Sequence, residues 1–400
     1  MIQALYLHVP FCTSRCSYCD FDTEACHDDE LMDAYTDALS LAVRRASKAG
    51  LLTGVKTIYI GGGTPSYLGA RRLSSLVYMI SVSIQLENVC EFTLEANPDS
   101  LDERMVKDLF ALGVDRFSLG VQSFSDAELS ALGRAHNAKA AERAIATVQE
   151  RTDNLSIDLI CGAPGQDLAS WEASINRALE LGVRHVSVYP LMLEEGTPLT
   201  RAVEAGEATV ADEDLQADMM LAASRLLEQA GLSRYEVASY AAPGYEARHN
   251  EAYWTGVEYL GLGAGAASML TPQDFAACAD AGLFAEDAPV QVPADAARVR
   301  LGETHDVAAF CNSMGKMSFA PEFLDARKAA LEDLMLGMRL VRGVPVGQVE
   351  RASELEPRVP DAFAKLVDEG LVERKDDRFA PTQRGWLMGN EVFGEIWGLA

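Results

Sequence analysis

One short stretch near the N-terminus decides the fold and the chemistry of this chain: Leu5-Tyr6-Leu7-His8-Val9-Pro10-Phe11-Cys12-Thr13-Ser14-Arg15-Cys16-Ser17-Tyr18-Cys19-Asp20-Phe21-Asp22. Residues 3–9 have the apolar and aromatic character of a strand, and Pro10 ends it because proline offers no backbone donor. Cys12, Cys16 and Cys19 follow in a C-x3-C-x2-C pattern. Three thiolates on one tight loop can hold three irons of a cubic iron–sulfur cluster, which leaves the fourth iron open to a small-molecule ligand.

A zinc site and a set of buried free thiols are the alternatives to this cluster. Structural zinc usually has four ligands, often as two cysteine pairs, and no second pair stands nearby. The remaining cysteines are scattered singly and do not resemble a disulfide framework: Cys26, Cys90, Cys161, Cys278 and Cys311. We expect these five to be small core residues or inert thiols.

The composition predicts a soluble, acidic protein. The 400 residues carry a net charge of −26, which should repel bulk nucleic acid, and 48% are hydrophobic, which is ample for a large core. No apolar run approaches the 18 residues or so of a membrane span, and no basic leader with an apolar stretch precedes the first strand. Free thiols and an oxygen-sensitive cluster both indicate a cytoplasmic location.

Strand-like and helical patterns alternate through the first half of the chain. The expected strands are 3–9, 55–60, 89–96, 114–120, 155–161 and 183–191. The expected helices are 30–49, 70–82, 101–112, 125–132, 138–150 and 168–181. The strands are short and nearly continuously apolar, as parallel strands buried on both faces should be. The sequence therefore predicts an α/β fold, a partial (β/α)6 barrel of the TIM type, with its active site at the carboxyl ends of the strands.

The second half of the sequence does not continue the alternation of strands and helices. A long helix at 212–229 is expected first, and residues 271–295 have the composition of a surface excursion. Helices are expected at 321–341, 345–355, 360–369 and 384–397, with a hairpin around Lys375-Asp376-Asp377. We expect two domains, a barrel domain with its extension at 1–305 and a helical, winged-helix-like domain at 306–400. Its hairpin has few basic residues, which favours a lid or docking role over DNA binding.

The cysteine loop resembles that of the radical SAM enzymes, in which an aromatic residue precedes the third cysteine, as Tyr18 does here. Gly61-Gly62-Gly63-Thr64-Pro65 after the second strand resembles their glycine motif, which approaches the amino group of S-adenosylmethionine (SAM). A plain strand-to-helix turn is the alternative for this motif. The resemblance implies a [4Fe-4S] cluster on Cys12, Cys16 and Cys19, with SAM on the open iron. In that family the reduced cluster cleaves SAM to a 5′-deoxyadenosyl radical.

Further motifs resemble the oxygen-independent coproporphyrinogen dehydrogenase group: Leu5–Cys12, Gly61–Ser66, Leu94–Pro98, Ser118–Ser123 and Asp158–Ile160. In that group, residues matching Tyr6, Tyr18, Gly62 and Glu95 contact the cluster-bound SAM. Residues matching Gly63, Thr64, Gln122, Arg134 and Asp158 contact a second SAM. Carboxylates can bind ribose hydroxyls or an ammonium, and an arginine can pair with a carboxylate; the alternative for each is a satisfied polar residue at a strand end. Ala267, which follows a glycine-rich strand end, is the expected contact on the adenine side.

Two departures resemble instead the HemW branch, the haem chaperones. Phe21 stands where the dehydrogenases carry a further cysteine, and no long extension precedes the motif. An H-N-x-x-Y-W motif is present as His249, Asn250, Tyr253 and Trp254. The resemblance makes His249 the expected axial haem ligand, which is chemically reasonable for an imidazole, although a lone histidine is usually a satisfied polar group.

The sequence thus predicts a haem chaperone without a catalytic residue of its own. It would bind a [4Fe-4S] cluster, SAM and haem, and would deliver haem to acceptor proteins such as respiratory enzymes, including membrane-associated ones. A homodimer and a second SAM are left open. The alternative function is an oxygen-independent coproporphyrinogen III dehydrogenase, in which a deoxyadenosyl radical abstracts a propionate hydrogen and decarboxylation follows.

Overall fold

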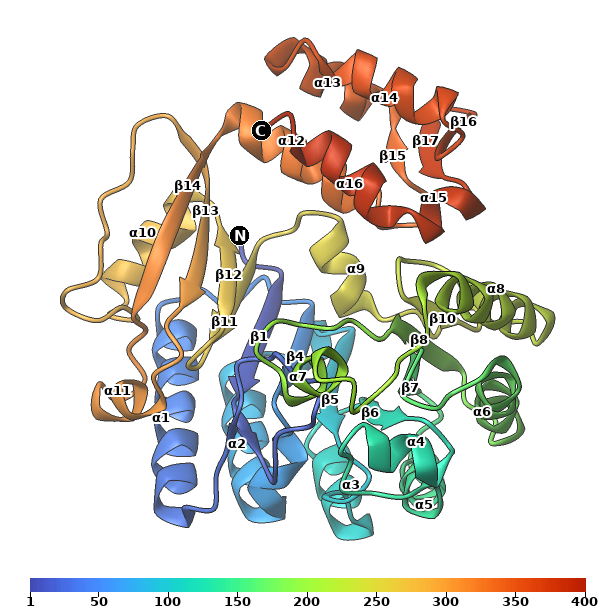
Figure 1. Cartoon of the computed structure of the whole chain (residues 1–400). Coiled ribbons are helices and arrows are strands. Elements are labelled where there is room, and N and C mark those ends of the chain that lie inside the picture. Colours follow the sequence, from blue (N-terminus) through green and yellow to red (C-terminus); the bar gives the residue numbers. More distant parts are fainter.

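Six parallel strands, each followed by helices, form the first half of the molecule, as predicted (Figure 1). The structure, a computed structural model, describes residues 1–400, the side chain of Glu303 excepted. The strands are β1 (Ala4–Val9), β4 (Thr57–Gly62), β5 (Glu91–Ala96), β6 (Arg116–Gln122), β7 (Leu155–Cys161) and β8 (His185–Pro190). The helices between them are α1 (Asp29–Lys48), α2 (Gly69–Ser83), α3 (Glu103–Ala111), α4 (Asp126–Ala131), α5 (Ala138–Gln149) and α6 (Leu168–Glu180). The prediction of a partial (β/α)6 barrel is confirmed.

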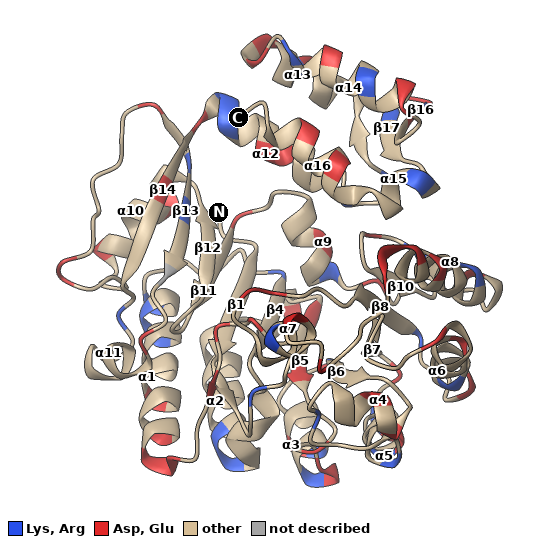
Figure 2. Cartoon of the chain, viewed as in Figure 1, with Lys and Arg blue, Asp and Glu red and all other residues tan. Residues whose placement is uncertain are grey.

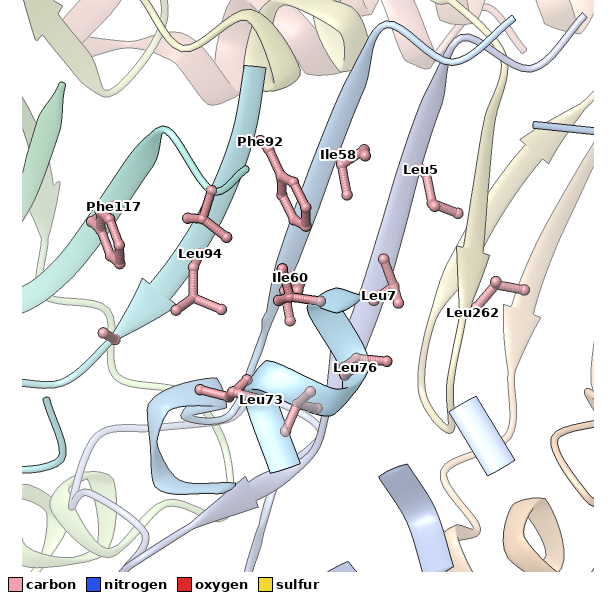
Figure 3. Close-up of a cluster of buried hydrophobic side chains, with 14 of the residues drawn as sticks. Leu5, Leu7, Ile58, Ile60, Leu73, Leu76, Phe92, Leu94, Phe117 and Leu262 are labelled. Carbon is pink, nitrogen blue, oxygen red and sulfur yellow. The ribbon is translucent and has the colours of Figure 1, made fainter. Parts of the chain in front are cut away.

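Alternate residues of each strand face opposite sides of the curved sheet. Leu5 and Leu7 of β1 lie in register with Ile58 and Ile60 of β4. Figure 3 shows these side chains gathered with others of the same kind against helix α2. The intervening residues, such as Tyr6 and its register partner in β4, face the barrel interior with polar groups. The apolar outer face therefore holds the helices, and the inner face is free for chemistry.

The sheet continues beyond the six predicted strands. Its order is β14-β13-β12-β11-β1-β4-β5-β6-β7-β8-β10-β9. The added strands are β9 (Ser233–Arg234), β10 (Ser239–Ala241), β11 (Tyr259–Leu262), β12 (Ala267–Leu270), β13 (Ala296–Glu303) and β14 (Phe319–Asp325). The helix predicted at 321–341 is wrong at its start, because Pro321 lies in the edge strand β14, where a missing backbone donor is tolerated. The surface excursion predicted at 271–295 is also wrong in part, because α10 (Pro272–Asp280) buries Phe275 and Cys278.

A second hydrophobic core, which runs from Leu331 to Ile396, holds the C-terminal module together. Its elements are α12 (Ala326–Gly337), β15 (Val344–Pro345), α13 (Val346–Leu355), α14 (Val359–Asp368), β16 (Val372–Lys375), β17 (Arg378–Pro381), α15 (Gln383–Leu387) and α16 (Gly389–Trp397). Strands β15, β17 and β16 form a small sheet of their own. The domain boundary expected at residue 306 falls between β13 and β14, which pair with each other.

Helix α9 (Arg248–Trp254) lies between the barrel and the C-terminal module (Figure 1). It contacts β4 on one side and α12 on the other. Glu251 pairs with Arg342 of the module at 2.7 Å, and the Arg339 guanidinium lies 5.0 Å from the centre of the Trp254 ring. The long helix predicted at 212–229 is present as α8 (Glu213–Gln229). The remaining elements are short: β2 (Phe11–Cys12), β3 (Glu24–Ala25), the 3-10 helices at Pro65–Leu68 and Leu86–Asn88, α7 (Pro198–Glu204) and α11 (Val307–Asn312).

Acidic side chains are spread over both the barrel helices and the C-terminal module, and they outnumber the basic ones (Figure 2). None of the helices in the described part of the chain combines the length and the apolar character needed to span a bilayer.

Candidate functional site

The three-cysteine loop leaves the sheet at the carboxyl end of β1, after Pro10, and the pairing of β2 with β3 closes it. Cys12, Cys16 and Cys19 are half-buried free thiols that line one cavity of about 140 Å³. Burial raises the pKa of the Cys12 and Cys19 thiols, and the neighbouring cysteines raise it further. Such thiols are basic ligands once a metal displaces their protons.

The surroundings of these sulfurs fit a cubic cluster. Among the described residues, no three His, Cys, Asp or Glu side chains converge as the ligands of a single metal ion do. A cubic cluster does not require that convergence, because each cysteine binds a different iron. Two polar groups contact the sulfurs: Thr64 Oγ1 lies 3.5 Å from Cys12 Sγ, and Arg134 Nη1 donates to Cys16 Sγ at 3.4 Å. Hydrogen bonds of this kind tune the potential of a cluster.

The glycines at the end of β4 bring the backbone close to the cysteine loop. Gly62 has a φ of 119°, and a Cβ there would come within 2.8 Å of the His8 ring. A Cβ on Gly63 would lie 3.0 Å from Cys12 Sγ. Both positions therefore require glycine, for the backbone conformation at the first and for space at both. The Gly62 N–H donates to Glu95 Oε2 at 3.1 Å and so links the glycine motif to the next strand.

Two carboxyl groups face the cavity, Glu95 from β5 and Asp158 from β7. Burial raises the pKa of Glu95 to about 7, and Asp158 raises it further, while a hydrogen bond from Tyr59, 2.5 Å from Glu95 Oε1, opposes the shift. Burial also raises the pKa of Asp158 to about 6. Both groups accept hydrogen bonds when ionised and can donate when protonated. They suit ribose hydroxyls, and a bound ammonium would favour their ionised forms.

Arg134 and Gln122 complete the wall of the cavity. Arg134 Nη2 donates to Asn97 Oδ1 at 2.7 Å and to the Gly120 carbonyl at 2.8 Å. Its Nε is buried with no partner among the described residues. Gln122 has a φ of 69°, in the left-handed region that residues other than glycine rarely occupy. Strain of this kind clusters at ligand sites, and here it lies at the carboxyl end of β6.

The structure brings together most of the residues singled out in the sequence. One cavity is lined by the three cysteines and by Tyr18, Gly62, Gly63, Thr64, Glu95, Gln122, Arg134 and Asp158. Tyr6 does not line this cavity. Its hydroxyl is 2.9 Å from His8 Nδ1, and its ring lies 6.2 Å from that of Tyr59. Ala267 does not line this cavity and is exposed at the start of β12.

His249 lies at the opposite end of the barrel from the cysteine loop. Its Nδ1 is 2.9 Å from Oγ1 of Thr57, the first residue of β4, and its Nε2 is 3.2 Å from the Tyr253 hydroxyl. Gly62 ends the same strand, so about 17 Å separates the two ends at the usual rise of an extended strand. The side chain is 1% exposed, and burial lowers its pKa to about 3. In this conformation both ring nitrogens are enclosed.

A second cavity, of about 400 Å³, continues into the barrel interior. Glu95 and Asp158 line both cavities. The second is also lined by Arg116, the first residue of β6, by His185, the first residue of β8, and by Tyr59. The sequence reasoning did not single out these three. The signal for Arg116 was present, because a charged residue opens a strand that is otherwise uncharged and buried.

Comparison with known proteins assigns the chain to a family. Residues 6–195 match the Radical SAM superfamily, and residues 324–388 match the HemN C-terminal domain. A protein of Lactococcus lactis subsp. lactis named Heme chaperone HemW is 31% identical over 98% of this chain and 96% of that protein. The chain belongs to the HemW family. A Heme chaperone HemW of Mycobacterium tuberculosis is 35% identical over 98% of this chain and 94% of that protein.

The fold of this HemW-family chain is also similar to a solved structure. Coproporphyrinogen III oxidase (HemN) from Escherichia coli, described as a radical SAM enzyme, aligns with a TM-score of 0.77 over 99% of this chain and 90% of that chain. The sequence identity is 19%, so the likeness concerns the fold alone. Membership of the radical SAM superfamily implies a [4Fe-4S] cluster and SAM. The three thiols suit the cluster, and the polar groups that line the same cavity suit SAM.

Proposed function

We propose that this chain is a haem chaperone. It binds a [4Fe-4S] cluster through Cys12, Cys16 and Cys19, holds SAM in the adjoining cavity, binds haem, and delivers the haem to acceptor proteins such as respiratory enzymes. One observation carries the proposal: the three cysteines share a cavity with the glycine and carboxylate wall, in a chain that is similar over its whole length to proteins named haem chaperones.

Each side chain of the cavity has a distinct part in this proposal. A cluster held by the three cysteines would, when reduced, supply one electron to SAM. Gly62 and Gly63 leave room for the ligand, and Glu95, held in place by the Gly62 N–H at 3.1 Å, faces the ligand's ammonium or ribose group. Arg134 Nε, which has no partner among the described residues, is a donor for a ligand carboxylate.

Haem ligation by His249 requires a change of conformation. The imidazole is 1% exposed. Glu91, the first residue of β5, accepts hydrogen bonds from the backbone N–H groups of Arg248 and His249 at 2.8 and 2.9 Å. These bonds hold the start of α9 on the barrel floor, which is the end of the barrel where the parallel strands begin. The pair between Glu251 and Arg342 ties the same helix to the C-terminal module. We therefore propose that haem reaches His249 only after α9 leaves the floor.

Haem titration into the reconstituted protein tests the proposal. Wild type should bind haem with a defined Soret band, and His249→Ala should weaken binding and shift the band, because an axial ligand is lost. His27→Ala, which removes an exposed histidine, is the matched control and should behave as wild type. An unchanged band and affinity in His249→Ala would exclude His249 from this role.

Two further assays separate chaperone from enzyme. Haem-loaded protein mixed with a haem-free respiratory acceptor should transfer its haem, which the absorbance spectra of the separated proteins report. Anaerobic incubation with SAM, a reductant and coproporphyrinogen III should leave the porphyrinogen unchanged. Accumulation of protoporphyrinogen would replace the chaperone proposal with a dehydrogenase.

A further inference from the structure

The second cavity has an apolar rim and a cationic floor. Its lining includes Phe21, Tyr189 and Met192, which are 66%, 43% and 61% exposed. These side chains lie near the carboxyl ends of the strands, beside the cysteine loop and after β8. At the other end of the cavity lie Arg116 and His185, both 2% exposed. A ligand that fits this space has an apolar body and a polar group that reaches inward.

Arg116 is a buried cation with no direct counter-ion. Its Nε has no hydrogen-bond partner, and no ion pair within 4.0 Å involves its guanidinium among the described residues. Glu95 and Asp158 are close enough for Arg116 to lower the pKa of both carboxyl groups, but neither contacts it directly. A buried charge is costly unless it is paired and hydrogen-bonded. Arg116 Nε is therefore a buried donor without an acceptor among the described residues.

His185 adds a second donor beside Arg116. The backbone N–H of Ala247 donates to the Tyr235 hydroxyl at 3.1 Å, which leaves that hydroxyl free to donate to His185 Nε2, 2.9 Å away. In a neutral imidazole the proton then lies on Nδ1, and this atom is buried without a partner among the described residues. Burial lowers the pKa of His185 well below its usual value, and Arg116 lowers it further, so the neutral form is the relevant one.

Hydroxyl groups line the wall next to these donors. Ser156 lies in register with both Ser118 and His185, and it donates to the Ser118 hydroxyl at 2.8 Å. Both serines line the cavity. We propose that Arg116 and His185 form a carboxylate-binding subsite on the barrel floor, which takes a propionate of haem. The part of this inference that names haem rests on the proposed function, whereas the carboxylate subsite stands on the buried donors alone.

The chemistry of the donors favours a carboxylate. A guanidinium presents a planar fork that matches the two oxygens of a carboxylate. Haem carries its carboxylates on flexible arms attached to a flat apolar ring, which agrees with an apolar rim above a cationic floor. Binding at this floor also differs from ligation by His249, so the subsite and the axial ligand are tested separately.

Comparison of haem with its dimethyl ester tests the subsite in the full-length, cluster-loaded protein. Wild type should bind haem roughly 10-fold or more tightly than the ester, because only the free propionate forms charge-assisted hydrogen bonds. Arg116→Gln should remove this preference by weakening haem binding while the ester binds as before. Arg116→Lys keeps the charge but loses the planar fork of the guanidinium, so its preference for haem over the ester should lie between those of wild type and Arg116→Gln.

The control variant is Arg184→Gln, which removes an exposed arginine next to the start of β8 and should keep the wild-type preference. A purely structural role of Arg116 would weaken haem and ester binding equally, and that result would overturn the proposal. A loss of SAM affinity in Arg116→Gln with no change in haem affinity would also overturn it, since the carboxylate recognised would belong to SAM. If Arg116→Gln does not fold, His185→Gln replaces it.

A second arm remains valid if wild type does not bind haem, a result that would refute the proposed function alone. About 100 mM sodium propionate should raise the Tm of wild type above that in sodium chloride of equal ionic strength, because a ligand of the folded state stabilises it. Arg116→Gln should lose this difference. Equal melting temperatures of wild type in the two salts would refute the subsite.

Discussion

Replacement of Glu95 by Gln should change how stability depends on pH. Burial raises the pKa of Glu95 from 4.5 to about 7. A carboxyl group with a raised pKa in the folded state contributes stability that is fully present below about pH 4.5 and is lost as the pH rises through about 7. Glutamine does not ionise, so the variant should not share this loss. The free energy of unfolding of the variant should therefore increase relative to that of wild type as the pH rises.

The size of the effect follows from the shift. A rise of this extent corresponds to about 3 kcal/mol, and contact of Glu95 with the cavity reduces this to about 1–2 kcal/mol through solvent screening. For a chain of 400 residues, each kcal/mol moves the Tm by roughly 1 °C. The difference in Tm between Glu95→Gln and wild type should thus be about 1–2 °C more favourable to the variant at pH 8 than at pH 5.

Scanning fluorimetry at pH 5 and pH 8, at one ionic strength, measures this difference. The variant should also show an offset common to both pH values, because glutamine has one acceptor oxygen for two donors, Tyr59 and Gly62. Only the change between the two pH values reports ionisation. Glu87→Gln, at an exposed position, is the control and should give a constant offset. A Tm difference for Glu95→Gln that is equal at both pH values, or more adverse at pH 8, would refute the reasoning.

Three other substitutions test the site and the fold. Gly63→Ala should lower the iron content after anaerobic reconstitution, measured by iron and sulfide assay, because its Cβ would lie 3.0 Å from Cys12 Sγ; wild-type content would contradict this. Arg134→Lys should weaken SAM binding in equilibrium dialysis by roughly 10-fold, since lysine cannot reproduce the guanidinium fork; equal affinity would show that the fork is not used. Arg298→Met should cost about 1.5–2 kcal/mol in a urea titration, because Glu332, 2% exposed, loses its partner at 2.6 Å and keeps only Arg300 at 2.8 Å. A cost below that of the exposed-site control Arg104→Met would refute the assignment.

The barrel and the main cavity could be predicted from the sequence because parallel strands impose a simple rule. Polar residues that follow buried strands must meet at one edge of the sheet. The cysteine loop after β1 and Gly63-Thr64 after β4 obey this rule. Glu95 and Asp158 lie inside β5 and β7 and line the same cavity from within the barrel. Local patterns sufficed here since each residue is placed by its own strand.

Features that depend on distant contacts could not be predicted in this way. The antiparallel strands β13 and β14 were missed because Pro321 and the alanine-rich segment before them weaken a strand pattern that pairing stabilises. A sequence motif also does not show whether its residues are exposed. The ring of His249 stacks on Tyr59, and its two nitrogens lie next to Thr57 and Tyr253. This position depends on where α9 packs. The sequence shows Arg116 as a lone charge at the start of an apolar strand, but its lack of a counter-ion is visible only in three dimensions.

The placement of Cys12, Cys16 and Cys19 on one short loop has a consequence for the assembly of the proposed cluster. Closing such small loops costs little chain entropy, so we expect the cysteine segment to be able to bind iron and sulfide before the rest of the polypeptide folds. Thr64 and Arg134, which contact the sulfurs, are synthesised later and would cover the proposed cluster when the barrel forms. Maturation of the metal centre and folding of the polypeptide would then follow the same order, from the ribosome outward.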